Sequence, residues 1–450
     1  MTTTRIQLSD HFTYGRLLRF VAPSIVMMLF LSVYTVVDGL FISNFAGKEP
    51  LAAINLIWPL FMITGAVGFM LGVGGNALVA KTMGEGDAQK ANEYFSLFVY
   101  VGIGVGAVLA VICVIILEPV SIAFGAEGVI LDQCVSYGRI LCVSMPFFMA
   151  QNMFQSFFIA AEKPNLGLAC TVIAGCINIA LDALFVAGFG WKLEGAAWAT
   201  AAGEIFGGIF PIIYFLRKND SRLKLTRTKF YFRALRKACF NGLSEMMMNV
   251  ASSIIVILYN IKLLEMIGED GVAAFGVVGY LMFIFIAVFL GFTMGASPII
   301  SFHFGAKNRE EQRNLFRKSL ILCGLGGIAI FVLAELTAVP LSVLFVGYDQ
   351  GLLDLTIRAM RIYSISYIIT GINIFSSAYF TALNDGLTSA LIAFLRTLVF
   401  QVAAIFILPL IFGVDGIWAA VIASEGLSFL VAVLLLKTRG MRSMRHDFVP

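Results

Sequence analysis

Two acidic residues lie inside stretches that are otherwise apolar, and they are the residues best suited to carry chemistry. Asp182 follows Asn178 by four residues within the apolar run 166–189, so both side chains share one face of a helix. Asp38 lies at a similar depth in an earlier apolar run. An Asp at the centre of a bilayer costs about 2.5–3.5 kcal/mol on insertion scales. Such residues usually mark the path of an ion, a proton or a substrate, although an Asp can also simply tie two helices together.

The composition predicts the kind of structure that positions these two acids. Charged residues make up 13% of the chain and apolar residues 60%, whereas a soluble domain has about 25% charged residues. We therefore expect an all-α polytopic membrane protein, with runs of about 20 apolar residues that each cross the bilayer as a helix. Twelve such spans are predicted, at approximately 18–43, 51–74, 94–117, 135–160, 166–189, 193–216, 239–263, 271–297, 317–341, 357–381, 387–411 and 415–436.

Charge in the loops predicts the orientation of these spans. Basic residues gather in the loops 217–237 and 307–318 and in the C-terminal tail, which contains Arg442 and Arg445. The loops on the other side are acidic. Because basic loops stay in the cytoplasm, both termini are expected there. The basic loop 217–237 could also be a patch for anionic lipid or nucleic acid, but a cytoplasmic linker explains it more simply.

The two halves of the chain repeat each other. One constant offset in residue number relates Gly84 to Gly305, Asn152 to Asn373 and Gly195 to Gly416. Each half has six spans, so the repeats are parallel, and a central cavity between two such bundles is typical of alternating access. We expect an N-terminal cytoplasmic segment (1–17), an N-lobe (18–216), a basic linker (217–238), a C-lobe (239–436) and a cytoplasmic tail (437–450).

Further polar residues are expected in the same layer of the N-lobe as the two acids. Tyr34 lies one helical turn before Asp38, and Thr200 lies in the outer half of the sixth span. Two acids in a low dielectric cannot both ionise cheaply. The acid pair could therefore hold a proton, or it could bind Na⁺ together with the oxygens of Asn178 and Thr200.

Two other N-lobe residues are expected to support this layer. Glu204 lies four residues inward of Thr200, on the same helical face. Pro23, in the span of Asp38, removes a helical hydrogen bond and allows a kink.

The C-lobe lacks this acid pair, because the same offset places Tyr259 and Ala403 at the positions that match Asp38 and Asp182. Its spans contain other polar residues, namely Glu245, Asn373, Arg396 and Glu425. Arg396 could form a structural ion pair with either Glu245 or Glu425, or it could contact a substrate. Glu245 precedes three methionines and could instead help to bind a cationic aromatic compound.

Motifs of soluble enzymes are absent from the sequence or weak. It has no phosphate-binding loop of the Gly-x-x-x-x-Gly-Lys-Ser/Thr type, no Cys-x-x-Cys pair and no pattern of metal-ligating histidines. The sequence therefore predicts neither an enzyme nor a cofactor other than a coupling ion.

The residues above resemble those of the multidrug and toxic compound extrusion (MATE) family over nearly the whole chain. The resemblance rests on Pro23, the Val37-Asp38-Gly39 pattern, the repeated loop glycines Gly84 and Gly305, the Asn178/Asp182 pair and the region 195–204. It implies a monomeric antiporter of the bacterial inner membrane that expels cationic amphipathic compounds in exchange for H⁺ or Na⁺.

The resemblance also implies roles for individual residues. In bacterial members the coupling cation is bound in the N-lobe, which here corresponds to Asp38, Asn178, Asp182 and Thr200, with Tyr34 nearby and Pro23 as the kink. Other branches use acids of the C-lobe, and Glu245 corresponds roughly to one of them. The tenth span has Asn373 where a second acid would be expected.

Two other functions remain open at this point. A flippase for a lipid-linked or other anionic amphipathic substrate would need several cations in mid-membrane, and Arg396 is the main one here. A membrane-embedded transferase would need clustered catalytic acids or metal ligands on its loops, and the sequence has none.

Overall fold

The structure is a computed structural model that describes the backbone of residues 6–45 and 48–440. It also describes their side chains, except those of residues 39–45, 48, 49, 51 and 52. The predicted basic residues Arg442 and Arg445 lie outside the described residues. All the regular secondary structure in the described part of the chain is helical, as the hydrophobic runs predict.

The first half of the chain forms one bundle, the N-lobe. Its helices are α1 (Tyr14–Phe45), α2 (Lys48–Gly84), α3 (Ala88–Ala123), α4 (Gly128–Ala160), α5 (Pro164–Asp182) with the π-helical turn η1 (Ala183–Gly188), and α6 (Lys192–Leu216).

The second half forms the C-lobe. Its helices are α7 (Phe232–Met266), α8 (Glu269–Gly305), α9 (Arg309–Val346), α10 (Gln350–Ser364), α11 (Tyr367–Ala382), α12 (Gly386–Phe394) with η2 (Leu395–Phe400) and α13 (Gln401–Phe412), and α14 (Val414–Leu435) with η3 (Leu436–Gly440).

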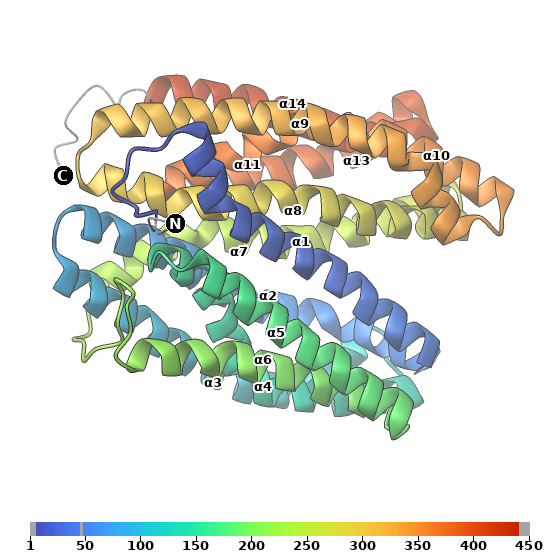
Figure 1. Cartoon of the computed structure of the whole chain (residues 1–450). Helices are drawn as coiled ribbons and strands as arrows, with labels where there is room; N and C mark the ends of the chain where they lie inside the picture. Colours follow the sequence, from blue (N-terminus) through green and yellow to red (C-terminus); the bar gives the residue numbers. More distant parts are fainter. Residues whose placement is uncertain (1–5, 46–47, 441–450) are drawn as a thin grey trace.

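These elements make up the twelve predicted spans. Ten helical stretches in the described part of the chain are long and apolar enough to cross a membrane. The fourth span is α4, and the tenth is divided into α10 and α11, which run beside the other helices (Figure 1). The chain is therefore a multi-pass membrane protein in which each predicted span corresponds to a helix or to consecutive helical segments.

The helices are longer than the apolar runs that predict them. The helix α1 begins at Tyr14, inside the segment predicted to precede the first span, and α7 begins at Phe232, inside the predicted linker. Basic side chains do not end a helix, so these helices extend beyond the apolar core. The linker between the two lobes is correspondingly shorter than predicted.

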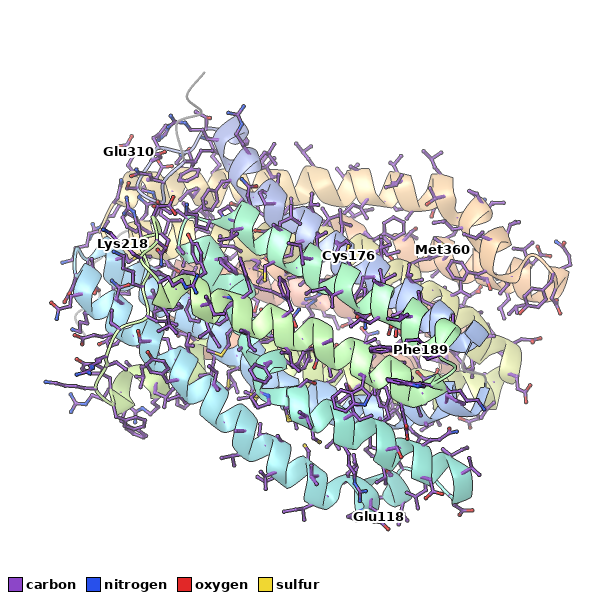
Figure 2. All side chains as sticks on the ribbon, turned by 60° about the horizontal axis from the view of Figure 1, so that its bottom comes forward. Glu118, Cys176, Phe189, Lys218, Glu310 and Met360 are labelled. Atoms are coloured by element: carbon purple, nitrogen blue, oxygen red, sulfur yellow. The ribbon has the colours of Figure 1, made fainter. Side chains whose placement is uncertain are left out.

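The two ends of the molecule differ in charge. Lys218 and Glu310 lie at one end, and Glu118 and Phe189 lie at the other (Figure 2). The first of these ends carries both termini of the described chain (Figure 1) and the basic loop 217–231. We call it the basic end and the opposite one the far end.

The lobes meet around a pseudo-two-fold axis at the basic end. A Cβ atom added to Gly84 on α2 would lie 2.0 Å from the carbonyl oxygen of Phe302 on α8. A Cβ added to Gly305 on α8 would lie 1.9 Å from the carbonyl oxygen of Lys81 on α2. Gly84 and Gly305 are equivalent in the sequence repeat, and so are Lys81 and Phe302. The contact is therefore reciprocal, as in a symmetric dimer interface.

Two further helix pairs continue this seam between the lobes. Gly242 on α7 packs against the carbonyl of Met70 on α2, where an added Cβ would lie 1.9 Å from the oxygen. Gly291 on α8 packs against Ser24 and Ile25 on α1. Toward the far end the two bundles diverge (Figure 1). The lobes are thus sealed against each other at the basic end and splayed apart at the far end.

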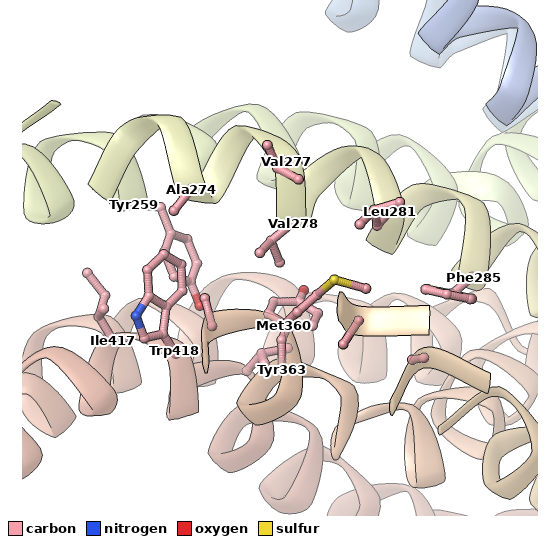
Figure 3. Close-up of a cluster of buried hydrophobic side chains, with 14 of the residues drawn as sticks. Tyr259, Ala274, Val277, Val278, Leu281, Phe285, Met360, Tyr363, Ile417 and Trp418 are labelled. Atoms are coloured by element: carbon pink, nitrogen blue, oxygen red, sulfur yellow. The ribbon is translucent and has the colours of Figure 1, made fainter. Parts of the chain in front are cut away.

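The far half of the C-lobe is held together by large apolar side chains. Tyr259 and Trp418 lie close to one another, and Met360 lies beside Tyr363 (Figure 3). Trp418 is fully buried, and these residues belong to one cluster to which α7, α8, α9, α10, α11, α13 and α14 contribute. Tight packing of this kind makes the lobe suited to move as a rigid body.

The N-terminal segment crosses the basic end and bonds to both lobes. The backbone N–H of Leu8 donates to the carboxylate of Glu162, between α4 and α5, at 2.9 Å. The backbone N–H of Phe12 donates to the carboxylate of Glu311 on α9, also at 2.9 Å. Leu8 and Phe12 are fully buried, so this segment is part of the seal at the basic end.

Candidate functional site

The two predicted acids meet inside the N-lobe. The carboxyl groups of Asp38 on α1 and Asp182 on α5 lie close enough to interact directly. Two adjacent carboxyl groups can share a hydrogen bond when one of them carries a proton, whereas an ionised carboxylate only accepts. The Oδ1 atom of each Asp is buried and has no hydrogen-bond partner among the described residues. The arrangement can therefore hold and release a proton.

A hydrogen-bonded pair lies beside the acids, as the depth argument predicts. The amide nitrogen of Asn178 donates to the hydroxyl of Thr200 at 3.2 Å, so α5 is joined to α6. Gly203 allows this approach, because a Cβ there would lie 2.9 Å from the carbonyl oxygen of Ala174. Tyr34 interacts electrostatically with Asp38. The structure thus brings together all five residues of the predicted layer.

The helix α5 ends at Asp182 and continues as the π-helical turn η1. Single π-helical turns are rare and often occur at functional sites. Here the turn begins immediately after the acid, so Asp182 lies at the boundary between two helix geometries. Pro23 lies inside α1, as predicted, close to the contact of Ser24 with Gly291.

One residue of this layer was not predicted from the sequence. Tyr137 on α4 is buried, and its hydroxyl interacts with the side chain of Thr200. It also interacts electrostatically with Asp38 and Asp182. A tyrosine inside an apolar span has no distinctive signal, because tyrosines are common near both membrane interfaces.

Glu204 lies inward of this layer and bonds to α4. Its Oε2 atom is 2.5 Å from the hydroxyl oxygen of Ser144, a second residue that was not predicted. Beside it is a cavity with room for about one water molecule. The residues that line this cavity are Trp58, Phe61, Leu141, Met145, Phe148 and Glu204.

In the C-lobe, Arg396 pairs with Glu425 rather than with Glu245. The guanidinium Nη2 of Arg396 lies 2.8 Å from Oε1 of Glu425, and its Nε donates to the same oxygen at 2.9 Å. Asn373 donates to the other carboxylate oxygen at 2.6 Å. Glu245 interacts with Arg396 only through its electrostatic field. Of the two ion pairs left open by the sequence, the structure contains the one with Glu425.

The C-lobe residue that matches Asp38 in the repeat is not an acid. Tyr259 is buried there, and its hydroxyl oxygen accepts a hydrogen bond of 2.8 Å from the side-chain amide of Gln401. This neutral pair has no ionisable acid, so the lobes are related in fold but not in chemistry.

A metal ion was one possible occupant of the N-lobe layer. The part of the chain that the structure describes contains no group of three or more His, Cys, Asp or Glu side chains placed to hold one. Besides the carboxyl oxygens of the two acids, the side-chain oxygens of Tyr34, Tyr137, Asn178 and Thr200 lie in this layer, and Oδ1 of Asn178 is buried without a hydrogen-bond partner among the described residues.

Comparison with known proteins agrees with this architecture. The MatE family model matches residues 23–184 and 242–407, which is most of the chain. The chain is 22% identical over 430 residues to the multidrug export protein MepA of Staphylococcus aureus (strain MRSA252), and the match covers 94% of this chain and 93% of MepA.

Solved structures share the fold. A crystal structure of MATE in complex with MaL6 superposes with a TM-score of 0.93 at 22% identity, covering 99% of this chain and 100% of that one. A structure described as the outward-facing conformation of a multidrug resistance MATE family transporter of the MOP superfamily superposes with a TM-score of 0.88, also at 22% identity and with the same coverage.

Proposed function

This chain belongs to the multidrug and toxic compound extrusion (MATE) family of transporters, and we propose that it exports cationic amphipathic compounds in exchange for protons. The basic end faces the cytoplasm, and the protein lies in the cytoplasmic membrane of a bacterium as a monomer. The relatives that match it over most of their length carry the name multidrug export protein, which supports drugs as the substrate class.

The observation that carries this proposal is the close approach of the carboxyl groups of Asp38 and Asp182. Without a proton, two adjacent carboxylates would lie in a buried layer, where their repulsion is poorly screened. A proton is the simpler occupant, because it relieves the repulsion between the two carboxyl groups without further ligands, whereas Na⁺ would also have to recruit the oxygens of Asn178 and Thr200. We therefore assign H⁺ as the coupling ion.

The conformation suits the step in which the proton is loaded. With the basic end in the cytoplasm, the glycine seam closes the cytoplasmic side, and the splayed far end opens the lobes outward. A proton from outside neutralises the acid pair and lowers the cost of closing the N-lobe around it. Export follows only if proton and drug favour different conformations, since a ligand that binds both states equally shifts nothing.

The Arg396–Glu425 pair supports an exporter of cations over a flippase of anionic lipids. Arg396 is the main cation in mid-membrane, and Glu425 neutralises it with two short contacts. A phosphate group would have to compete with this carboxylate. Glu245 in the C-lobe remains available to attract a cationic substrate.

The test is ethidium efflux from proteoliposomes in which H⁺ and Na⁺ gradients are imposed separately. We expect efflux by the wild type with an H⁺ gradient alone, and loss of efflux in Asp38→Asn and Asp182→Asn. Glu118→Gln, an acid at the far end (Figure 2), is the matched control and should transport normally. Efflux driven by Na⁺ alone would replace the proton by Na⁺, and wild-type rates in Asp182→Asn would remove the acid pair from the mechanism.

A further inference from the structure

We propose that Glu204 binds a second proton, separate from the one held by Asp38 and Asp182, so that two protons leave the N-lobe when substrate binds. This inference rests on the proposed function, because it concerns the ion exchanged for the drug. It adds a site on α6 and α4 that lies inward of the acid pair.

The hydrogen bonds of Ser144 suit a residue that gains and loses a proton. The Ser144 hydroxyl lies 2.5 Å from Oε2 of Glu204 and 3.0 Å from the carbonyl oxygen of Leu141. A hydroxyl has one hydrogen, so it can donate to only one of these oxygens at a time. When Glu204 is ionised, Ser144 donates to it. When Glu204 is protonated, Glu204 donates to Ser144, which turns its own hydrogen to Leu141. Both protonation states are therefore satisfied without a change in the backbone.

The surroundings of Glu204 offer no permanent counter-charge. It forms no ion pair with any Lys, Arg or His of the described residues. Apart from Glu204 itself, the cavity beside it is lined by apolar side chains, among them the aromatic rings of Trp58, Phe61 and Phe148. An isolated charge in such a site is costly unless it is paired or neutralised. A metal ion would find too few oxygens here, whereas a proton needs none beyond the carboxylate.

The repeat provides an internal comparison. The C-lobe residue that matches Glu204 in the repeat is Glu425, which Arg396 neutralises at 2.8 Å. The N-lobe residue that matches Arg396 is Gly175, and a Cβ there would lie 2.6 Å from the ring of Phe30. The two equivalent glutamates thus differ in their surroundings. Glu425 is paired with a fixed cation, whereas the position near Glu204 that matches Arg396 has no room for a side chain. A mobile cation therefore takes the place of the arginine at Glu204.

Other titratable groups face Glu204 from the helices around it. Tyr34 on α1 and Tyr137 on α4 interact electrostatically with Glu204, Asp38 and Asp182 alike. The α2 residues that line the cavity, Trp58 and Phe61, do not titrate. The three acids therefore have these two tyrosines as common neighbours, which places Glu204 next to the layer of the acid pair.

The experiment counts the protons released when ethidium binds to the purified protein in lipid nanodiscs, in weak buffer with a pH indicator. We expect two protons per bound ethidium for the wild type and one for Glu204→Gln. Glu194→Gln, an exposed acid on the same helix, should still release two. An unchanged count in Glu204→Gln would overturn the proposal, even if the affinity for ethidium fell, since Glu204 would then contact the drug rather than carry a proton.

A second measurement tests the proposal if Glu204→Gln does not bind ethidium. Infrared difference spectra between acidic and alkaline buffer should contain a carboxylic-acid carbonyl band that disappears in Glu204→Gln and shifts in Ser144→Ala. Absence of any such band from Glu204 would overturn the proposal. Failure of the wild type to export ethidium with a proton gradient would instead reject the proposed function, so the two failures are distinguishable.

Discussion

Arg396 and Glu425 form an ion pair inside the C-lobe, with 2.8 Å between Nη2 and Oε1. Both side chains are mostly buried, at 11% and 7% exposure. Asn373 holds the second carboxylate oxygen, and Ser424 donates to the backbone carbonyl of Arg396 at 2.8 Å. The pair therefore belongs to a network that ties η2, α11 and α14 together.

Removal of one partner should destabilise the protein strongly. In Arg396→Ala the carboxylate of Glu425 stays buried without its cation, which costs about 3–5 kcal/mol in comparable pairs. Unfolding in mixed micelles, followed by tryptophan fluorescence, measures the loss. Arg358→Ala breaks an exposed pair with Asp415 and should cost less than about 1 kcal/mol. Equal losses in the two variants would contradict the structural role of the buried pair.

The seam at Gly84 should not tolerate a side chain. In Gly84→Ala the new methyl group would lie 2.0 Å from the carbonyl oxygen of Phe302, and overpacking of this kind costs about 1–3 kcal/mol. This overpacking destabilises the conformation that is closed at the basic end, so we expect the two lobes to separate there. The labelling rate of Cys239, beside the seam on α7, by an impermeant maleimide should rise several-fold. In the control Gly104→Ala, the added Cβ would meet no atom within 4 Å, so the labelling rate of Cys239 should stay unchanged.

The fold could be predicted because two features can be read directly from the sequence, namely the length of each apolar run and the repeat of one half in the other. Apolar length predicts each span, and the constant offset between the halves predicts that Gly84 and Gly305 are equivalent, which their reciprocal contacts confirm. The types and depths of Asp38 and Asp182 predict that they meet. The roles of Tyr137 and Ser144 could not be found this way, because they depend on which face of α4 turns inward. The choice between the two glutamates as the partner of Arg396 likewise depends on tertiary packing.

Glu311 should hold the N-terminal segment in place. Its carboxylate accepts hydrogen bonds from the backbone of Phe12 and from Asn314, and it pairs with His11 at 2.5 Å. In Glu311→Ala the buried N–H of Phe12 loses its acceptor, which costs about 1–3 kcal/mol. We expect faster tryptic cleavage at Arg16 and a lower melting temperature. Glu310→Ala, its exposed neighbour (Figure 2), is the control, and equal cleavage of both variants would argue against this anchoring.

Tyr137 should affect how readily the acid pair of Asp38 and Asp182 takes up its proton, although it does not belong to the pair. In Tyr137→Phe the ring still fills its buried position, but the hydroxyl that interacts with the side chain of Thr200 is lost. A polar contact of hydrogen-bond strength contributes about 1 kcal/mol, or roughly fivefold in an equilibrium constant. Because Thr200 accepts a hydrogen bond from Asn178 on α5, loss of the Tyr137 hydroxyl loosens the helix that carries Asp182. We therefore expect ethidium efflux to need a larger proton gradient, while the maximal rate falls little. Efflux measured against external pH gives both quantities, and a lower maximal rate at an unchanged half-maximal pH would show that Tyr137 acts on the substrate path instead.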